Sequence, residues 1–200
     1  MQFTLIYEGP LRSNGDRNHK HAIREYLRPQ LELLWTLPPL VTMREGAIGI
    51  PRPRNAGDDD GTMTEMLDSI RTPDNRVERR GVYFFPLVSE NLNLRAAIDI
   101  TWFRPEEPGR VLQSGDIDNR LKTLFDGLQV PPHENQFPDT PIVGTATEPF
   151  HCLLEDDALI SSLNVDTRQM LRVSSDDSVL LLIKVTTKIT EIEFGNIQIL

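Results

Sequence analysis

The sequence has little cysteine, no long apolar run and a shortage of positive charge. Cys152 is the one cysteine among 200 residues, so no intrachain disulfide can form and a reducing compartment is expected. No apolar stretch reaches the roughly 18 residues of a membrane-spanning helix. Residues 1–8 lack the basic segment and apolar core of a signal peptide. We therefore expect a cytoplasmic protein that does not associate with a membrane.

The chain is acidic, with 21 Lys and Arg against 30 Asp and Glu and a formal net charge of −9. Taken alone, this charge argues against nucleic-acid binding, because contacts with phosphates need local positive charge. Two arguments weaken that exclusion. Bound metal ions offset the carboxylates that hold them, and a local basic patch can persist on an acidic protein.

The apolar periodicity predicts an α+β (mixed α/β) fold, with a mixed sheet flanked by two main helices. The clearest strand is 92–103, where apolar residues alternate with polar ones, and the continuous apolar run 179–185 predicts a strand buried on both faces. Pro29 should kink or split the first helix. The predicted strands cover 2–8, 82–88, 92–103, 159–165, 168–173, 178–187 and a short segment within 191–200, and the predicted helices cover 18–37 and about 116–128.

Two segments interrupt these patterns. Residues 44–80 and 130–150 are rich in proline and turn-forming residues, so we expect insertions or long loops within a single domain that spans 1–200. Within the first segment, 63–70 could form one or two helical turns, and the acidic run 58–60 is expected to be a solvated loop.

A cluster of chemically capable residues lies at the start of the second helix, in the run Gly115-Asp116-Ile117-Asp118-Asn119-Arg120-Leu121-Lys122. A carboxylate here could cap the helix and interact with its dipole, but a cap explains one aspartate and not two. Asp118, Lys122 and Asp126 follow at i, i+4 and i+8 along one flank of the apolar stripe. Such spacing also occurs in ordinary surface salt bridges.

A second acidic element, Glu155-Asp156-Asp157, stands immediately before a predicted strand. Three consecutive acids repel one another unless positive charge neutralises them, although a solvated turn could tolerate them. A hard divalent cation shared with Asp116 and Asp118 would neutralise the repulsion. Magnesium prefers such oxygen ligands and keeps several waters, which suits a site open to a phosphate.

The pattern Asp116-Ile117-Asp118-Asn119, with Lys122 and Phe125-Asp126, and Asp156-Asp157 later in the chain, resembles the signature of the RusA-like endodeoxyribonucleases. The resemblance implies a small α/β homodimer that cuts four-way DNA junctions of recombination and repair with Mg²⁺ or Mn²⁺. It implies that Asp116, Asp118 and Asp157 are the essential acids, Asp156 is an accompanying metal ligand, and Lys122 is needed for catalysis.

We further expect Arg120, Lys122, Arg76, Arg79 and Arg80 to contact the DNA backbone, although clustered arginines are more often simple surface residues. Two alternatives remain. The net charge and Gly115, where the family usually has a basic residue, favour a nuclease-derived binding or regulatory protein that does not cut junctions. A metal-dependent hydrolase of small phosphate esters needs no basic surface.

The remaining reactive side chains are expected to be bystanders. Cys152 and His151 are adjacent on an expected extended segment and should point to opposite faces, so Cys152 is predicted to be buried or incidental. His19 and His21 are expected on the surface near the helix start, and His133 is expected to take no part in the site.

Overall fold

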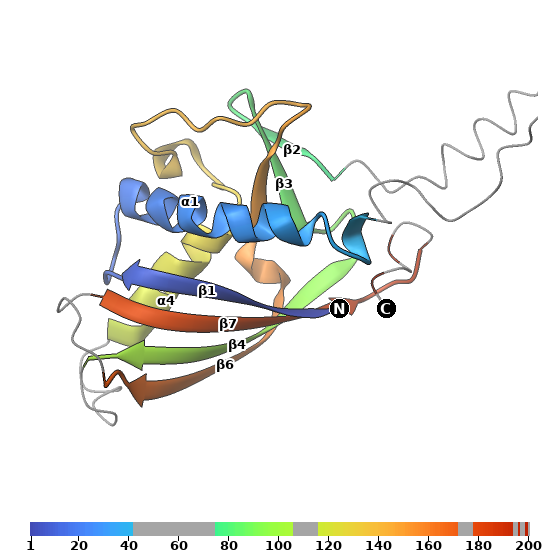
Figure 1. Cartoon of the computed structure of the whole chain (residues 1–200). Coiled ribbons are helices and arrows are strands. Elements are labelled where there is room, and N and C mark those ends of the chain that lie inside the picture. The colour runs from blue at the N-terminus through green and yellow to red at the C-terminus, as the bar shows by residue number, and fades with distance from the viewer. Residues whose placement is uncertain (42–74, 106–115, 172–177, 194–195, 197–198, 200) are drawn as a thin grey trace, which may run out of the picture.

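The computed structural model describes residues 1–41, 75–105, 116–171, 178–193, 196 and 199, and for Asp116 it describes the backbone alone. The described part is an α+β arrangement of two helices, α1 (Arg17–Leu34) and α4 (Asp116–Leu128), with two β-sheets (Figure 1). The broad fold class predicted from the sequence is therefore confirmed. The prediction of a single mixed sheet was wrong, because the described strands form one four-stranded and one three-stranded sheet.

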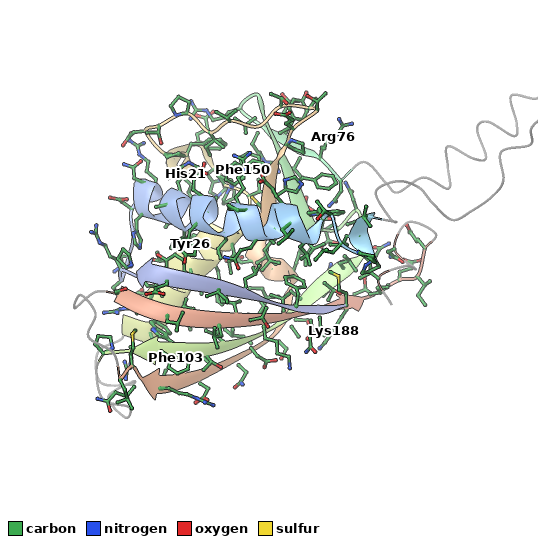
Figure 2. All side chains as sticks on the ribbon, in the orientation of Figure 1. His21, Tyr26, Arg76, Phe103, Phe150 and Lys188 are labelled. Atoms are coloured by element: carbon green, nitrogen blue, oxygen red, sulfur yellow. The ribbon has the colours of Figure 1, made fainter. Side chains whose placement is uncertain are left out.

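The larger sheet contains the first and last strands along the chain. Its order is β1 (Gln2–Pro10), β7 (Ser178–Ile189), β4 (Leu94–Arg104) and β6 (Ile160–Gln169). β7 pairs antiparallel with both β1 and β4, whereas β4 and β6 are parallel. α1 covers one face of this sheet, while Phe103 and Lys188 lie on the other face (Figure 2).

The smaller sheet has the order β2 (Val77–Arg79), β3 (Val82–Val88) and β5 (Phe150–Leu154). β3 pairs antiparallel with β2 and parallel with β5. The chain changes sheet between β3 and β4, through a short turn in which Asn93 has a φ of 51°. Asparagine tolerates this left-handed conformation better than most residues, because its short polar side chain can bond locally.

The two helices pack against each other, and α1 also contacts β1 and β5. Gly127 of α4 makes the close approach possible, because a Cβ there would lie 2.8 Å from Cβ and Cγ2 of Ile23. The main core combines both helices and the larger sheet, and includes Leu5, Ile23, Ile98, Leu124 and Ile183. A smaller core lies beneath β3 and β5 and includes Phe84, Val130, Phe137, Phe150 and Cys152.

Several predicted elements differ from the structure for identifiable reasons. Pro29 does not split the first helix, which stays continuous from Arg17 to Leu34. Buried Leu27 and Leu31 on either side hold it to the core, which offsets the one hydrogen bond that proline removes. β7 is not buried on both faces, because its burial alternates along the strand. Within the described residues, α1 and α4 pack on the same face of the larger sheet.

Other differences concern the ends and the interrupted segments. One strand, β6, replaces the two predicted at 159–165 and 168–173, and the described residues of 191–200 form no strand. Residues 77–79 of the predicted loop 44–80 form β2, whereas 44–74 lie outside the described residues. Segment 130–150 contains the 3-10 turn η1 (Glu134–Gln136) and supplies buried side chains to the smaller core.

Candidate functional site

The second predicted acidic element, Glu155-Asp156-Asp157, lies where α4 and β5 end. β5 stops at Leu154, and after Glu155 the chain forms the 3-10 turn η2 (Asp157–Leu159). The side chain of Asp156 caps this turn, since its Oδ1 accepts a hydrogen bond of 2.8 Å from the backbone N–H of Ala158. The backbone N–H of Val130, just after α4, donates to the carbonyl of Leu154. These bonds place η2 beside the end of α4.

Gln129 connects the two elements through its side-chain amide. Its Nε2 donates to Oδ1 of Asp126 at 3.1 Å, and its Oε1 accepts from the backbone N–H of Asp157 at 2.8 Å. Gln129 is buried, so both bonds are shielded from competing water. The position of Asp157 is therefore fixed relative to the acidic flank of α4.

Asp126 is the buried acid of this cluster, with 4% of its surface exposed. Its Oδ2 lies 2.7 Å from Nζ of Lys20 in α1, so the carboxylate is paired with a cation. Arg24, also in α1, donates to the backbone carbonyls of Asp126 and Gln129. Two basic side chains of α1 thus hold the end of α4 in place.

More negative than positive charge surrounds the carboxyl of Asp157. Partial desolvation raises the pKa of its carboxyl, even though the residue is largely exposed. The neighbouring charges of Asp156 and Asp126 raise this pKa further, and Lys122 opposes them. Residues distant in the sequence therefore share one electrostatic environment, and it is richer in carboxylates than in cations.

The other predicted residues of α4 lie along the same helix. Asp116 begins the helix, but its side chain lies outside the described part of the chain. Asp118 and Lys122 are both exposed. They are one helical turn apart, about 6 Å along the axis, so Asp118 lies farther from the end of the helix where Asp126 and Gln129 adjoin η2. The structure brings Lys122 and Asp126 to Asp157 more directly than it brings Asp118.

The carboxylates of Asp156 and Asp157 are the type of oxygen ligand that Mg²⁺ prefers. Among the side chains that the structure describes, no group of three or more His, Cys, Asp or Glu is placed to hold a metal ion. The described side chains therefore show no metal site, and the side chain of the predicted ligand Asp116 lies outside them.

The predicted phosphate-binding arginines lie on separate elements. Arg120 is half-buried on α4, while Arg76, Arg79 and Arg80 are exposed around β2. Arg76 donates to the carbonyl of Ala146 at 2.9 Å, and the guanidinium of Arg80 lies 5.4 Å from the ring centre of Phe137. The three arginines around β2 form a second basic region, built on the smaller sheet.

Sequence reasoning missed Lys20, Arg24 and Gln129, the side chains that hold the site together. Lys122, Asp118 and Asp126 share a flank of α4, but Asp126 pairs with α1 instead of Lys122. His19 and His21 are buried, contrary to the predicted surface position, because α1 packs closely on α4 and β5. His133 is exposed. Cys152 is buried as predicted, and burial raises its pKa to about 12.

Comparison with known proteins gives no match to a family model, a curated protein or a solved structure. No helix in the described ranges has both the length and the apolar character to cross a membrane.

Proposed function

We propose that this chain is a Mg²⁺- or Mn²⁺-dependent endonuclease that cleaves branched DNA, acting as a homodimer. The supporting observation is that Asp157 of η2 shares one acidic environment with Lys122 and Asp126 of α4. In this proposal Asp116, Asp118, Asp156 and Asp157 supply the oxygen ligands. A bound divalent ion would activate water and stabilise the leaving oxygen of a phosphodiester.

The chain's own side chains have distinct roles in this proposal. Lys122 neutralises negative charge on the scissile phosphate, and its exposed position leaves the ammonium accessible to a substrate. Asp126 and Gln129 act as positioning residues, because they fix the backbone of Asp157 from the side opposite the solvent. Arg120 and the exposed arginines around β2 contact the DNA backbone.

The test is cleavage of labelled four-way, flap and linear DNA with and without Mg²⁺ at low salt. Asp118→Asn and Asp157→Asn should each reduce Mg²⁺-dependent cutting of the four-way substrate at least about a hundredfold, since each removes a charged ligand. Asp166→Asn is the matched control, because Asp166 is an exposed acid on β6 that pairs with Arg168. This control should cut like the wild type. Undiminished cleavage by both site variants would refute the proposal.

A second readout separates ligand loss from misfolding. Mg²⁺ bound to the native protein should raise the thermal unfolding temperature of the wild type and of Asp166→Asn, but not of Asp157→Asn. The same comparison with Ca²⁺ would show whether binding depends on the charge of the ion alone.

A nuclease-derived binding protein is a second candidate, favoured by the net charge of −9 and by the absence of a three-ligand group among the described side chains. Failure to bind branched DNA at low salt, together with binding of a protein partner, would select this alternative.

A further inference from the structure

A cavity of about 520 Å³ lies away from the acidic site, between the second half of α1, β3 and the segment that precedes β5. Its volume is within the range of small-molecule sites, roughly 300–1,000 Å³. Arg28 in its wall lies eight residues beyond Lys20 on α1, which corresponds to about 12 Å of helix. The cavity is therefore separate from the acidic site, and it shares Arg76 with the proposed DNA contacts.

One wall of the cavity is aromatic and rigid. The ring of Phe85, on β3, is half-buried, and its centre lies 4.6 Å from that of the buried Trp35. The ring of His151 stands edge-on to Phe85, with a centre-to-centre distance of 5.6 Å. Contacts on two sides thus fix the orientation of Phe85. A planar ring of a ligand could pack against it with little loss of side-chain entropy.

The cavity also has two oriented guanidinium groups. The guanidinium of Arg28 lies 4.8 Å from the ring centre of Phe150, and its Nε donates to Oε1 of Glu32 at 2.5 Å. Among the described residues, its two terminal nitrogens donate no hydrogen bond, so they remain available to an oxyanion. Arg76 is oriented by its bond to the carbonyl of Ala146, and Figure 2 shows it on the same side of α1 as Phe150. Guanidinium groups with fixed planes suit phosphate recognition.

Two acids complete the lining and exclude a simple polyanion. Oε1 of Glu32 lies 3.8 Å from Nδ1 of His151, and Glu148 is exposed at the rim. Carboxylates repel a ligand that carries negative charge alone, but they accept hydrogen bonds from hydroxyl and amino groups. A ligand that matches this lining combines a ring, one phosphate and several N–H or O–H donors.

We propose that this cavity binds a nucleotide monophosphate, with the base against Phe85 and the phosphate on Arg28 and Arg76. The sugar hydroxyl and the amino group of the base donate hydrogen bonds to the carboxylates of Glu32 and Glu148. The same chemistry is present in a free nucleotide and in the phosphorylated end of a DNA strand. This proposal does not depend on the acidic site, so it stands or fails separately from the proposed metal-dependent cleavage.

The test is calorimetric titration of the full chain with deoxyadenosine monophosphate, deoxyadenosine and inorganic phosphate. The nucleotide should bind more tightly than either part. Arg28→Gln should weaken nucleotide binding about tenfold or more, because a hydrogen bond to a charged group is lost. Phe85→Leu should weaken binding of the nucleotide and the nucleoside but not of phosphate.

Arg168→Gln is the matched control, since Arg168 is an exposed arginine on β6 of the other sheet. It should bind the nucleotide like the wild type, and Asp157→Asn should do so as well. Because Arg28 packs on Phe150, thermal unfolding of each variant is measured, and the exposed Arg76→Gln provides the test if Arg28→Gln does not fold. Absence of nucleotide binding at millimolar concentration, equal affinity for inorganic phosphate, or an equal loss in Arg168→Gln would overturn the proposal.

A further comparison identifies the source of the nucleotide. An oligonucleotide with a 5′ phosphate and the same strand without it are titrated into the wild type and Arg28→Gln. If the phosphorylated strand binds more tightly than the unphosphorylated one, and Arg28→Gln removes this difference, the cavity binds the end of a DNA strand. Binding of the mononucleotide alone assigns it to free nucleotides.

Discussion

Gln129 illustrates how a side chain without catalytic chemistry organises an acidic site. It bonds to the carboxylate of Asp126 with one amide atom and to the backbone of Asp157 with the other. A glutamine between a helix and a buried loop has no distinctive sequence pattern. The sequence singles out the aspartates because neighbouring acids repel one another, whereas the side chains that hold Asp126 and Asp157 depend on how α1 packs on α4.

Asp126→Asn should lower the pKa of Asp157 toward its ordinary value. The charge of Asp126 is one of the causes of the raised pKa, after desolvation and Asp156. Carbon-13 NMR titration of the Asp157 carboxyl would measure the shift. An unchanged pKa in a folded variant would show that the two carboxyls do not interact.

Asp126→Asn should also destabilise the fold by about 1–3 kcal/mol, because Lys20 loses a partner in a mostly buried pair.

Asp157→Asn should change the pH dependence of stability. A folded-state pKa above the unfolded value stabilises the native protein at low pH, and this contribution is lost as pH rises through the folded-state pKa. The variant should therefore gain stability relative to the wild type as pH rises, as measured by urea unfolding across the acidic range.

Single elements with strong periodicity were the easiest to predict. β4 alternates buried and half-buried residues, and α4 carries its apolar stripe on the core as expected. β5 was missed because Phe150 to Leu154 is short and follows a proline-rich segment. The division into two sheets was also missed, since alternation reveals which residues face a core but not which strands pair.

Gln30→Ala tests how the edge of the larger sheet is closed. The Gln30 side chain accepts from the backbone N–H of Ile6 at 2.9 Å and donates to its carbonyl at 2.7 Å, so it substitutes for a neighbouring strand. The variant should lose about 1 kcal/mol of stability, because both bonds are partly exposed to water.

An open edge also pairs with other chains, so Gln30→Ala should self-associate more than the wild type in sedimentation. Gln169→Ala, an exposed glutamine on β6, is the matched control. Equal behaviour of the two variants would show that the bonds from Gln30 do not protect the edge.

At the scale of the whole molecule, charge governs the proposed binding of DNA. A chain with a net charge of −9 must bind through local basic regions, so affinity for branched DNA should fall steeply with salt. Arg79→Gln and Arg80→Gln should each reduce the slope of log affinity against log salt by about 1, as measured by fluorescence anisotropy. A slope that responds equally to Arg168→Gln would remove β2 from the proposed interface.

The pairing of β1 with β7 has a consequence for synthesis of the chain. Among the described strands, β1 pairs with β7 alone, and Gln2 pairs with Thr186. Contacts so distant in sequence form late, because a long loop must close first. During synthesis β1 therefore cannot pair with β7 until residues 178–189 have emerged from the ribosome.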